Sequence, residues 1–252
     1  MGEQGTMAGA WAPTARGPAL WTAGEAGTAL VAQSALLWAL VPLAGLGPLG
    51  WGAGALHAAA LTGLLLWAMR RRGRTVLGTA DRVTLSRAVL GGGVLALAVD
   101  GGPAWALVTL ASAALVLDLV DGAVARGSGT ASEFGARFDM EADAFLILVL
   151  SAYVSLHLGP WVLAVGLLRY LFAAGARVAP FLRAPLPPST ARKVVAAAQG
   201  IVLTVAASGV AAHTLSVVAV ASALAALLWS FGRDTVWLWR SHRRPGLTGG
   251  EA

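Results

Sequence analysis

The sequence predicts an all-α integral membrane protein, and its composition and apolar runs are the observations that predict it. Hydrophobic residues make up 57% of the 252 residues and charged residues only 12%, whereas a soluble domain carries about 25% charged residues. The mean hydropathy is +0.73. Apolar runs of about 20 residues, long enough to cross a bilayer as a helix, recur along the chain.

Eight membrane-spanning helices are expected from these runs. Turns rich in glycine and proline, at 45–48, 101–103 and 159–160, separate several of them. The expected spans are 29–46, 50–69, 83–100, 104–124, 141–158, 160–180, 193–210 and 213–237.

The spans group into an N-terminal hairpin and a core. Residues 1–28 lack the basic start and short apolar segment of a cleaved signal, so we expect a flexible N-terminal tail there. Residues 29–70 form an additional transmembrane hairpin, which the basic segment RRRGRT separates from the rest. Residues 75–240 form a six-helix core, and residues 241–252 form a basic cytoplasmic tail.

Basic residues lie in alternate connections only, which orients the bundle. They are Arg70, Arg71, Arg72, Arg74 and Arg82; Arg126 and Arg137; Arg183, Arg192 and Lys193; and Arg240, His242, Arg243 and Arg244. The turns near 47, 102, 159 and 211 contain no Lys or Arg. The positive-inside rule then predicts a multi-pass protein of the cell membrane whose basic loops and both termini face the cytoplasm.

Composition also excludes several kinds of site and partner. The chain contains no cysteine, so it has no disulfide, zinc–thiolate site or thiol nucleophile. The net charge of +6 sits in short loops between apolar spans, which is typical of topology signals and of contact with anionic lipid or phosphate. We therefore expect the lipid bilayer, and no nucleic acid, as a partner.

Four aspartates lie in or beside apolar helical sequence: Asp118, Asp121, Asp139 and Asp143. An ionised side chain deep in a bilayer costs about 2.5–3.5 kcal/mol on insertion scales, so this grouping needs a compensating partner. Asp118 and Asp121 share one helical face, and Asp139 and Asp143, four residues apart, share a face of the next helix. An antiparallel hairpin brings the two pairs together, and divalent cations take carboxylate oxygens as ligands.

Neighbouring residues extend this stripe. Gly122 and Ala125 fall on the face of Asp118, where small residues let a ligand approach the backbone. Arg126, one position later, offers a fork of hydrogen-bond donors to a phosphate.

Two other interpretations stay open from the residues alone. Acidic residues near an interface cap helix ends or pair with arginines, and this is our interpretation of Glu133 and Glu141. It explains the four aspartates less well, because caps do not require two same-face pairs. A divalent-cation transporter that uses the intramembrane aspartates as its permeation site is the second alternative.

Eight residues fit the pattern Asp-x2-Asp-Gly-x2-Ala-Arg-x8-Gly-x3-Asp-x3-Asp: Asp118, Asp121, Gly122, Ala125, Arg126, Gly135, Asp139 and Asp143. In this pattern the sequence resembles the CDP-alcohol phosphotransferase (CDP-alcohol phosphatidyltransferase) family, over about residues 75–240. The resemblance implies a six-span core and an enzyme of phospholipid biosynthesis. Such an enzyme transfers a phospho-alcohol group from a CDP-linked donor to an acceptor hydroxyl and releases CMP. The resemblance also implies a homodimer.

The resemblance further implies roles for individual residues. Asp118, Asp121 and Asp139 would hold Mg²⁺ or Mn²⁺, as two ions. Asp143 would complete the metal site and act as the catalytic general base toward the acceptor hydroxyl. The expected contacts to the CDP group are Asp118, Gly122, Ala125, Arg126, Gly135 and Thr84.

Residues outside the aspartate pattern add weaker resemblances. Thr84 and Arg87 lie in a stretch similar to the Asn-x2-Thr-x2-Arg of many members, with Asp81 in place of the asparagine. The alternative for Arg87 is an arginine that snorkels from a helix end to the interface.

Four basic residues are candidate contacts to the acceptor: Arg169, Arg192, Lys193 and Arg137. Arg169 lies inside a span, and pairing with an aspartate of the pattern is its alternative role. The resemblance implies CDP-diacylglycerol as the donor. The alternative enzyme uses a soluble CDP-alcohol and a diacylglycerol acceptor, and the pattern does not specify the acceptor alcohol.

Overall fold

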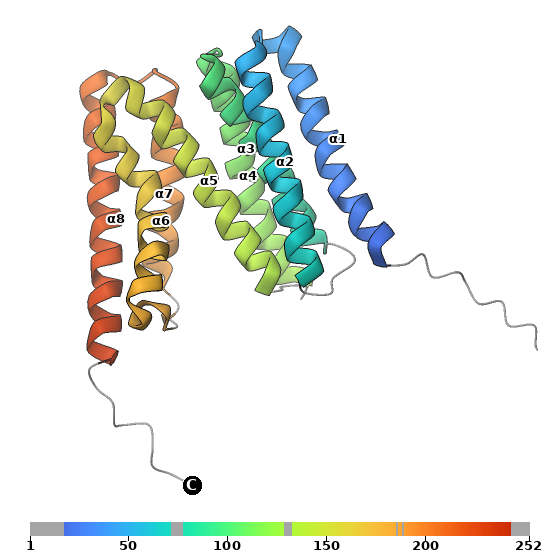
Figure 1. Ribbon diagram of the computed structural model, residues 1–252. Coiled ribbons are helices and arrows are strands. Elements are labelled where there is room, and N and C mark those ends of the chain that lie inside the picture. Colours follow the sequence, from blue (N-terminus) through green and yellow to red (C-terminus); the bar gives the residue numbers. More distant parts are fainter. Residues whose placement is uncertain (1–17, 72–77, 129–132, 185, 188, 243–252) are drawn as a thin grey trace, which may run out of the picture.

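The computed structural model describes residues 18–71, 78–128, 133–184, 186–187 and 189–242, and over this part of the chain it is helical, with no strand (Figure 1). The α-helices of these residues are α1 (Pro18–Ala44), α2 (Pro48–Arg71), α3 (Thr79–Asp100), α4 (Ala104–Ser128), α5 (Glu133–Leu158), α6 (Leu163–Val178), α7 (Thr190–Ala207) and α8 (His213–His242). Short 3₁₀ segments, η1 (Pro160–Val162) and η2 (Pro180–Arg183), precede and follow α6. The predicted all-α fold is confirmed.

Within the described residues, seven helices are long and apolar enough to cross a membrane. Within the described residues, α4 also contains a shorter apolar segment, Ala104–Leu119. The expected spans correspond in order to α1 to α8. The chain is therefore a multi-pass membrane protein by the length and composition of its helices.

Several helices extend beyond the apolar runs that predicted them. α1 begins at Pro18 rather than at 29, so residues 18–28 of the predicted tail are helical; residues 1–17 and 243–252 lie outside the described part. Proline suits a first helical turn because its missing N–H has no intrahelical partner there. α7 begins at Thr190, where the hydroxyl of Ser189 accepts a hydrogen bond from the backbone N–H of Arg192 at 3.4 Å. Hydropathy marks the lipid-immersed part of a helix, and backbone hydrogen bonding continues past it.

The predicted tight turns are confirmed, and glycine explains their geometry. Gly45, Gly101 and Gly159 have φ angles of +69°, +70° and +105°, and Gly209 has +65°. Only glycine adopts these angles readily. All four lie at one end of the antiparallel bundle, opposite the end at which α2, α4, α6 and α8 finish. We call this second end the basic end, because Arg71, Arg183 and Arg240 lie there.

α3 is the central helix of the first half of the molecule. It packs against α1, α2, α4 and α5, and Figure 1 shows α5 crossing obliquely between a group formed by α1 to α4 and a group formed by α6 to α8. The middle of α3 contains three consecutive buried glycines, 91–93. A Cβ on Gly93 would lie 2.8 Å from the side chains of Leu36 on α1 and Leu110 on α4. The glycines therefore let the neighbouring helices approach α3 closely.

The N-terminal hairpin, α1 and α2, is hydrogen-bonded to the end of α3, a contact that was not expected from the sequence. Asp100, the last residue of α3, accepts hydrogen bonds from the backbone N–H groups of Gly47 at 2.5 Å and Gly50 at 3.1 Å. These N–H groups belong to the start of α2 and have no partner within the helix. The carboxylate also interacts favourably with the positive end of the helix dipole.

Candidate active site

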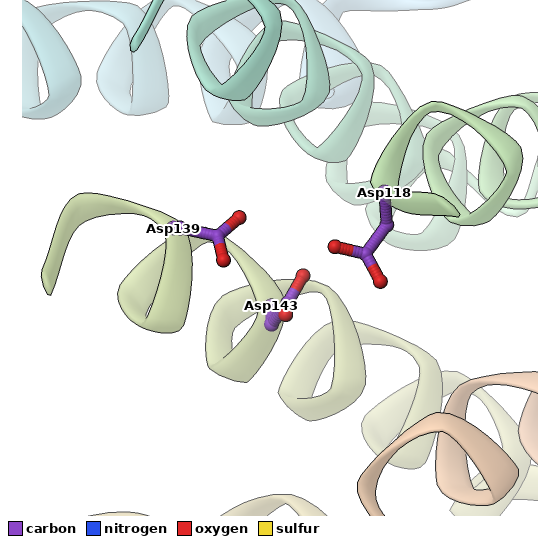
Figure 2. Close-up of side chains that lie close together, drawn as sticks. All are labelled: Asp118, Asp139 and Asp143. Atoms are coloured by element: carbon purple, nitrogen blue, oxygen red, sulfur yellow. The ribbon is translucent and has the colours of Figure 1, made fainter. Parts of the chain in front are cut away.

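Three aspartates of the predicted site converge from two helices. Figure 2 shows Asp118 on α4 facing Asp139 and Asp143 on α5. Each offers a carboxylate oxygen, and these oxygens lie within 4.8 Å of one another. Asp139 and Asp143 are one helical turn apart, which places both carboxylates on the same side of α5, as their spacing predicted. The cluster lies toward the basic end of the bundle.

A buried arginine lies among the three carboxylates. The side chain of Arg87, on α3, is only 4% exposed. Its Nη1 lies 2.9 Å from Oδ1 of Asp118, and its guanidinium also pairs with Asp139 and Asp143. This position decides between the two interpretations of Arg87, because a snorkelling arginine would direct its head group into the aqueous interface.

The charge and accessibility of the cluster fit a divalent cation. The three carboxylates are 37–39% exposed, so a ligand has access to them although Arg87 is buried beneath. Within the described residues of the cluster, three carboxylates surround one guanidinium. Carboxylate oxygens at this spacing are ligands that Mg²⁺ and Mn²⁺ favour. The donor set therefore fits the metal that the sequence pattern predicts.

A comparison with protein families assigns the chain. The family model described as CDP-alcohol phosphatidyltransferase matches residues 77–231. The chain belongs to this family. No curated protein matches the chain, and no solved structure matches it.

Membership in the CDP-alcohol phosphatidyltransferase family makes the protein an enzyme, a transferase with a phosphatidyl-transfer role in phospholipid synthesis. The prediction of an enzyme is confirmed, whereas the roles of the individual aspartates stay predictions. The matched segment contains the whole acidic pattern, whereas α1 and α2 lie outside it.

The remaining residues of the family pattern are only partly described. Asp121, Gly122, Ala125 and Arg126 lie on α4, but their side chains fall outside the described part of the structure, so their predicted contacts stay predictions. Gly135 lies in the first turn of α5 and is partly exposed.

Two residues of α3, Asp81 and Thr84, make hydrogen bonds with the backbone near the start of the helix. Thr84 is buried one turn before Arg87, and its hydroxyl donates a hydrogen bond to the carbonyl of Ala80 at 3.2 Å. Asp81, which replaces the asparagine common in the family, accepts a hydrogen bond from the N–H of Gly78 at 3.0 Å. Asp81 therefore stabilises the start of α3.

The four candidate acceptor residues differ in their partners and in their exposure to solvent. Arg169, on α6, pairs with Glu141 at 2.6 Å, so its alternative pairing with an aspartate of the pattern is wrong, and the predicted arginine partner of Glu141 is confirmed. Arg192, on α7, pairs with Asp234 of α8 at 3.2 Å. Lys193 and Arg137 are exposed.

Proposed function

We propose that this enzyme transfers a phosphatidyl group from CDP-diacylglycerol to an alcohol and releases CMP, on the cytoplasmic side of the cell membrane. The observation that carries the proposal is the accessible carboxylate cluster of Asp118, Asp139 and Asp143 in a chain of this family. The basic residues at the same end support the cytoplasmic orientation through the positive-inside rule. The water-soluble cytidine group of the donor binds at that same end.

The aspartates have distinct roles in the proposed reaction. Asp118, Asp139 and Asp143, together with Asp121, bind Mg²⁺ or Mn²⁺, as two ions. Cations held there would neutralise the donor diphosphate and would stabilise the leaving CMP. Arg87 holds Asp139 and Asp143 side by side through its two guanidinium nitrogens, and it sets the spacing of these ligands.

Asp143 acts as the general base of the transfer. The acceptor oxygen forms a bond to the phosphorus that carries the lipid, and its proton passes to the Asp143 carboxylate. The bond between that phosphorus and the bridging oxygen breaks, and CMP leaves with the electron pair. A positioned base makes a weak nucleophile such as an alcohol reactive at the moment of attack, and positioning supplies much of the acceleration in phosphoryl transfer.

The remaining binding contacts follow from the family pattern. Gly122, Ala125, Arg126, Gly135 and Thr84 contact the CDP group. Arg169, Arg192, Lys193 and Arg137 are the candidates for a phosphate or other anionic group on the acceptor. A homodimer is proposed from the family resemblance, and light scattering of the purified protein in detergent measures it.

The test is a reconstituted assay with defined lipids. Purified protein in nanodiscs receives CDP-diacylglycerol, Mn²⁺ and one of glycerol 3-phosphate, inositol phosphate or serine, and both CMP and the lipid product are measured by mass spectrometry. A parallel reaction contains a soluble CDP-alcohol and diacylglycerol. We expect CMP and a new phospholipid with CDP-diacylglycerol; a product in the parallel reaction alone would reverse the donor and acceptor.

A matched pair of variants tests the base. Asp143→Asn removes the proton acceptor, and we expect CMP release to fall by at least about 10²-fold. Asp100→Asn makes the same substitution at the opposite end of the bundle, where the amide oxygen still accepts a hydrogen bond from α2, and most activity remains. Equal activity in Asp143→Asn and the unaltered enzyme would overturn the role of Asp143.

A further inference from the structure

The N-terminal hairpin lies outside the family match but contacts the helices that carry the acidic cluster. α1 and α2 both pack on α3, the helix of Arg87. Contacts also reach α5, the helix of Asp139 and Asp143, at two places: one from a side chain of α2, and one from an apolar cluster that α1 and α2 share with α3. Through these contacts the hairpin packs against α3 and α5, two of the helices that carry residues of the site.

The first place is a buried polar pair in the middle of the helices. Gln33 of α1 is fully buried, and within the described residues both polar atoms of its amide, and Nδ1 of His57 on α2, have no hydrogen-bond partner. A Cβ on Gly92 of α3 would overlap both Oε1 of Gln33 and Nδ1 of His57, so these two atoms are neighbours above the glycine. A buried polar group without a partner costs about 1–3 kcal/mol, and Nδ1–H of a neutral histidine is a donor suited to the amide oxygen.

His57 also contacts α5. Its ring stacks on the ring of Phe145, with centroids 4.9 Å apart and planes inclined by 30°. A Cβ on Gly91 would lie 3.5 Å from the Phe145 ring, so α3 also packs against this ring. Phe145 follows Asp143 by two residues on the same helix.

The second place lies nearer the basic end. Ala29 of α1, Leu65 and Met69 of α2 and Leu85 of α3 form a small buried cluster, and Phe138 of α5 packs against it. Phe138 immediately precedes Asp139. Phe138 and Phe145 are seven residues apart and share one face of α5, while Asp139 and Asp143 lie about 100–140° around the helix.

We propose that the hairpin is a positioning element for the acidic cluster. The His57 ring, buried beside the Gln33 amide above Gly92, packs against Phe145, and the apolar cluster packs against Phe138. Together they fix the height and rotation of the α5 turn that carries Asp139 and Asp143, relative to Asp118 on α4. The consequence for catalysis rests on the proposed function, whereas the consequence for metal binding does not require turnover.

The experiment compares variants of the full chain in nanodiscs by three measurements: Mn²⁺ affinity by electron paramagnetic resonance without nucleotide, kcat and KM for CMP release, and the unfolding midpoint. His57→Ala is expected to weaken Mn²⁺ binding and to lower kcat, each by about tenfold, as loss of a group that orients metal ligands does. KM for the donor stays within about twofold, because the CDP contacts are elsewhere. Phe145→Leu removes the other ring of the stack and gives the same pattern if His57→Ala folds poorly.

Two further variants separate positioning from general stability. Replacing both polar partners, as Gln33→Leu with His57→Phe, keeps a ring against Phe145 and leaves no unpaired polar group, so Mn²⁺ affinity recovers to within about threefold of the unaltered protein. His157→Ala is the matched control, since His157 lies on α5 near its far end and is exposed; its Mn²⁺ affinity is unchanged. If His57→Ala and Phe145→Leu lower the unfolding midpoint but leave Mn²⁺ affinity and kcat unchanged, the hairpin is only structural and the proposal is wrong. If the unaltered protein releases no CMP, the proposed function fails, and the Mn²⁺ affinities still decide the positioning role.

Discussion

Replacing Arg87 by methionine removes the positive charge from the acidic cluster while keeping an unbranched apolar side chain in its place. The guanidinium is 4% exposed and pairs with Asp118, Asp139 and Asp143. The carboxylate oxygens lie within 4.8 Å of one another, and two like charges at that limit repel by about 3.5 kcal/mol at an effective dielectric constant of about 20. The carboxylates are more than one-third exposed, so solvent screening reduces this to about 1 kcal/mol per pair, or about 3 kcal/mol for the cluster.

The assay is thermal unfolding in detergent, first with EDTA and then with Mn²⁺. A loss of about 3 kcal/mol lowers the unfolding midpoint by roughly 6–12 °C in a chain of this length, so we expect that decrease for Arg87→Met in EDTA. Mn²⁺ supplies the missing positive charge and therefore raises the midpoint of Arg87→Met more than that of the unaltered protein. CMP release falls as well, because the spacing of Asp139 and Asp143 is lost.

The control for this variant is Arg70→Met, which removes an exposed arginine from the same end of the bundle. Its midpoint in EDTA stays within about 2 °C of the unaltered protein, since exposed surface charges contribute little. If Arg87→Met unfolds at the unaltered temperature in EDTA, or gains no more from Mn²⁺ than the unaltered protein does, Arg87 is not the counter-charge of the cluster.

Further predictions concern packing, ion pairing and metal. Gly93→Ala places a Cβ 2.8 Å from two leucines and lowers the stability of the protein by about 1–3 kcal/mol. Gly63→Ala, on the open face of α2, raises the stability by about 0.5–1 kcal/mol. The unfolding midpoints of the two variants measure this contrast. A double-mutant cycle of Arg192→Met and Asp234→Asn gives a coupling of about 1 kcal/mol, and additive effects would show that the pair contributes nothing. Asp100→Ala lowers stability by about 1–2 kcal/mol by removing the cap of α2, while CMP release stays above half. EDTA abolishes CMP release and added Mn²⁺ or Mg²⁺ restores it; activity in EDTA would contradict the metal role of the aspartates.

Local spacing allowed the sequence to predict much of the site. The four-residue interval between Asp139 and Asp143 defines a helical face without any tertiary information. The convergence of Asp118 followed from antiparallel helices joined by a short connection. The apolar runs gave the fold class and the order of helices, because a bilayer imposes length and composition on every span.

Tertiary packing explains what the sequence could not predict. Nothing in the spacing of Arg87 showed that α3 would bring it between α4 and α5, so a residue of the family-like stretch and a snorkelling arginine were equally compatible with the sequence. The partner of Arg169 depended on the rotation of α6 against α5, which placed Glu141 within reach. Helix starts such as Pro18 and Thr190 depend on capping outside the apolar runs, where hydropathy carries little information.

The three glycines of α3 also bear on how the chain is synthesised. Each glycine within a helix costs about 1 kcal/mol relative to alanine, so the segment around Gly92 is a poor helix until its neighbours cover it. Translation proceeds from the N-terminus, so α1 and α2 enter the membrane before α3 leaves the ribosome. We expect the hairpin to provide α3 with a ready docking surface during insertion, and a chain that starts at residue 75 to assemble its first core helix slowly.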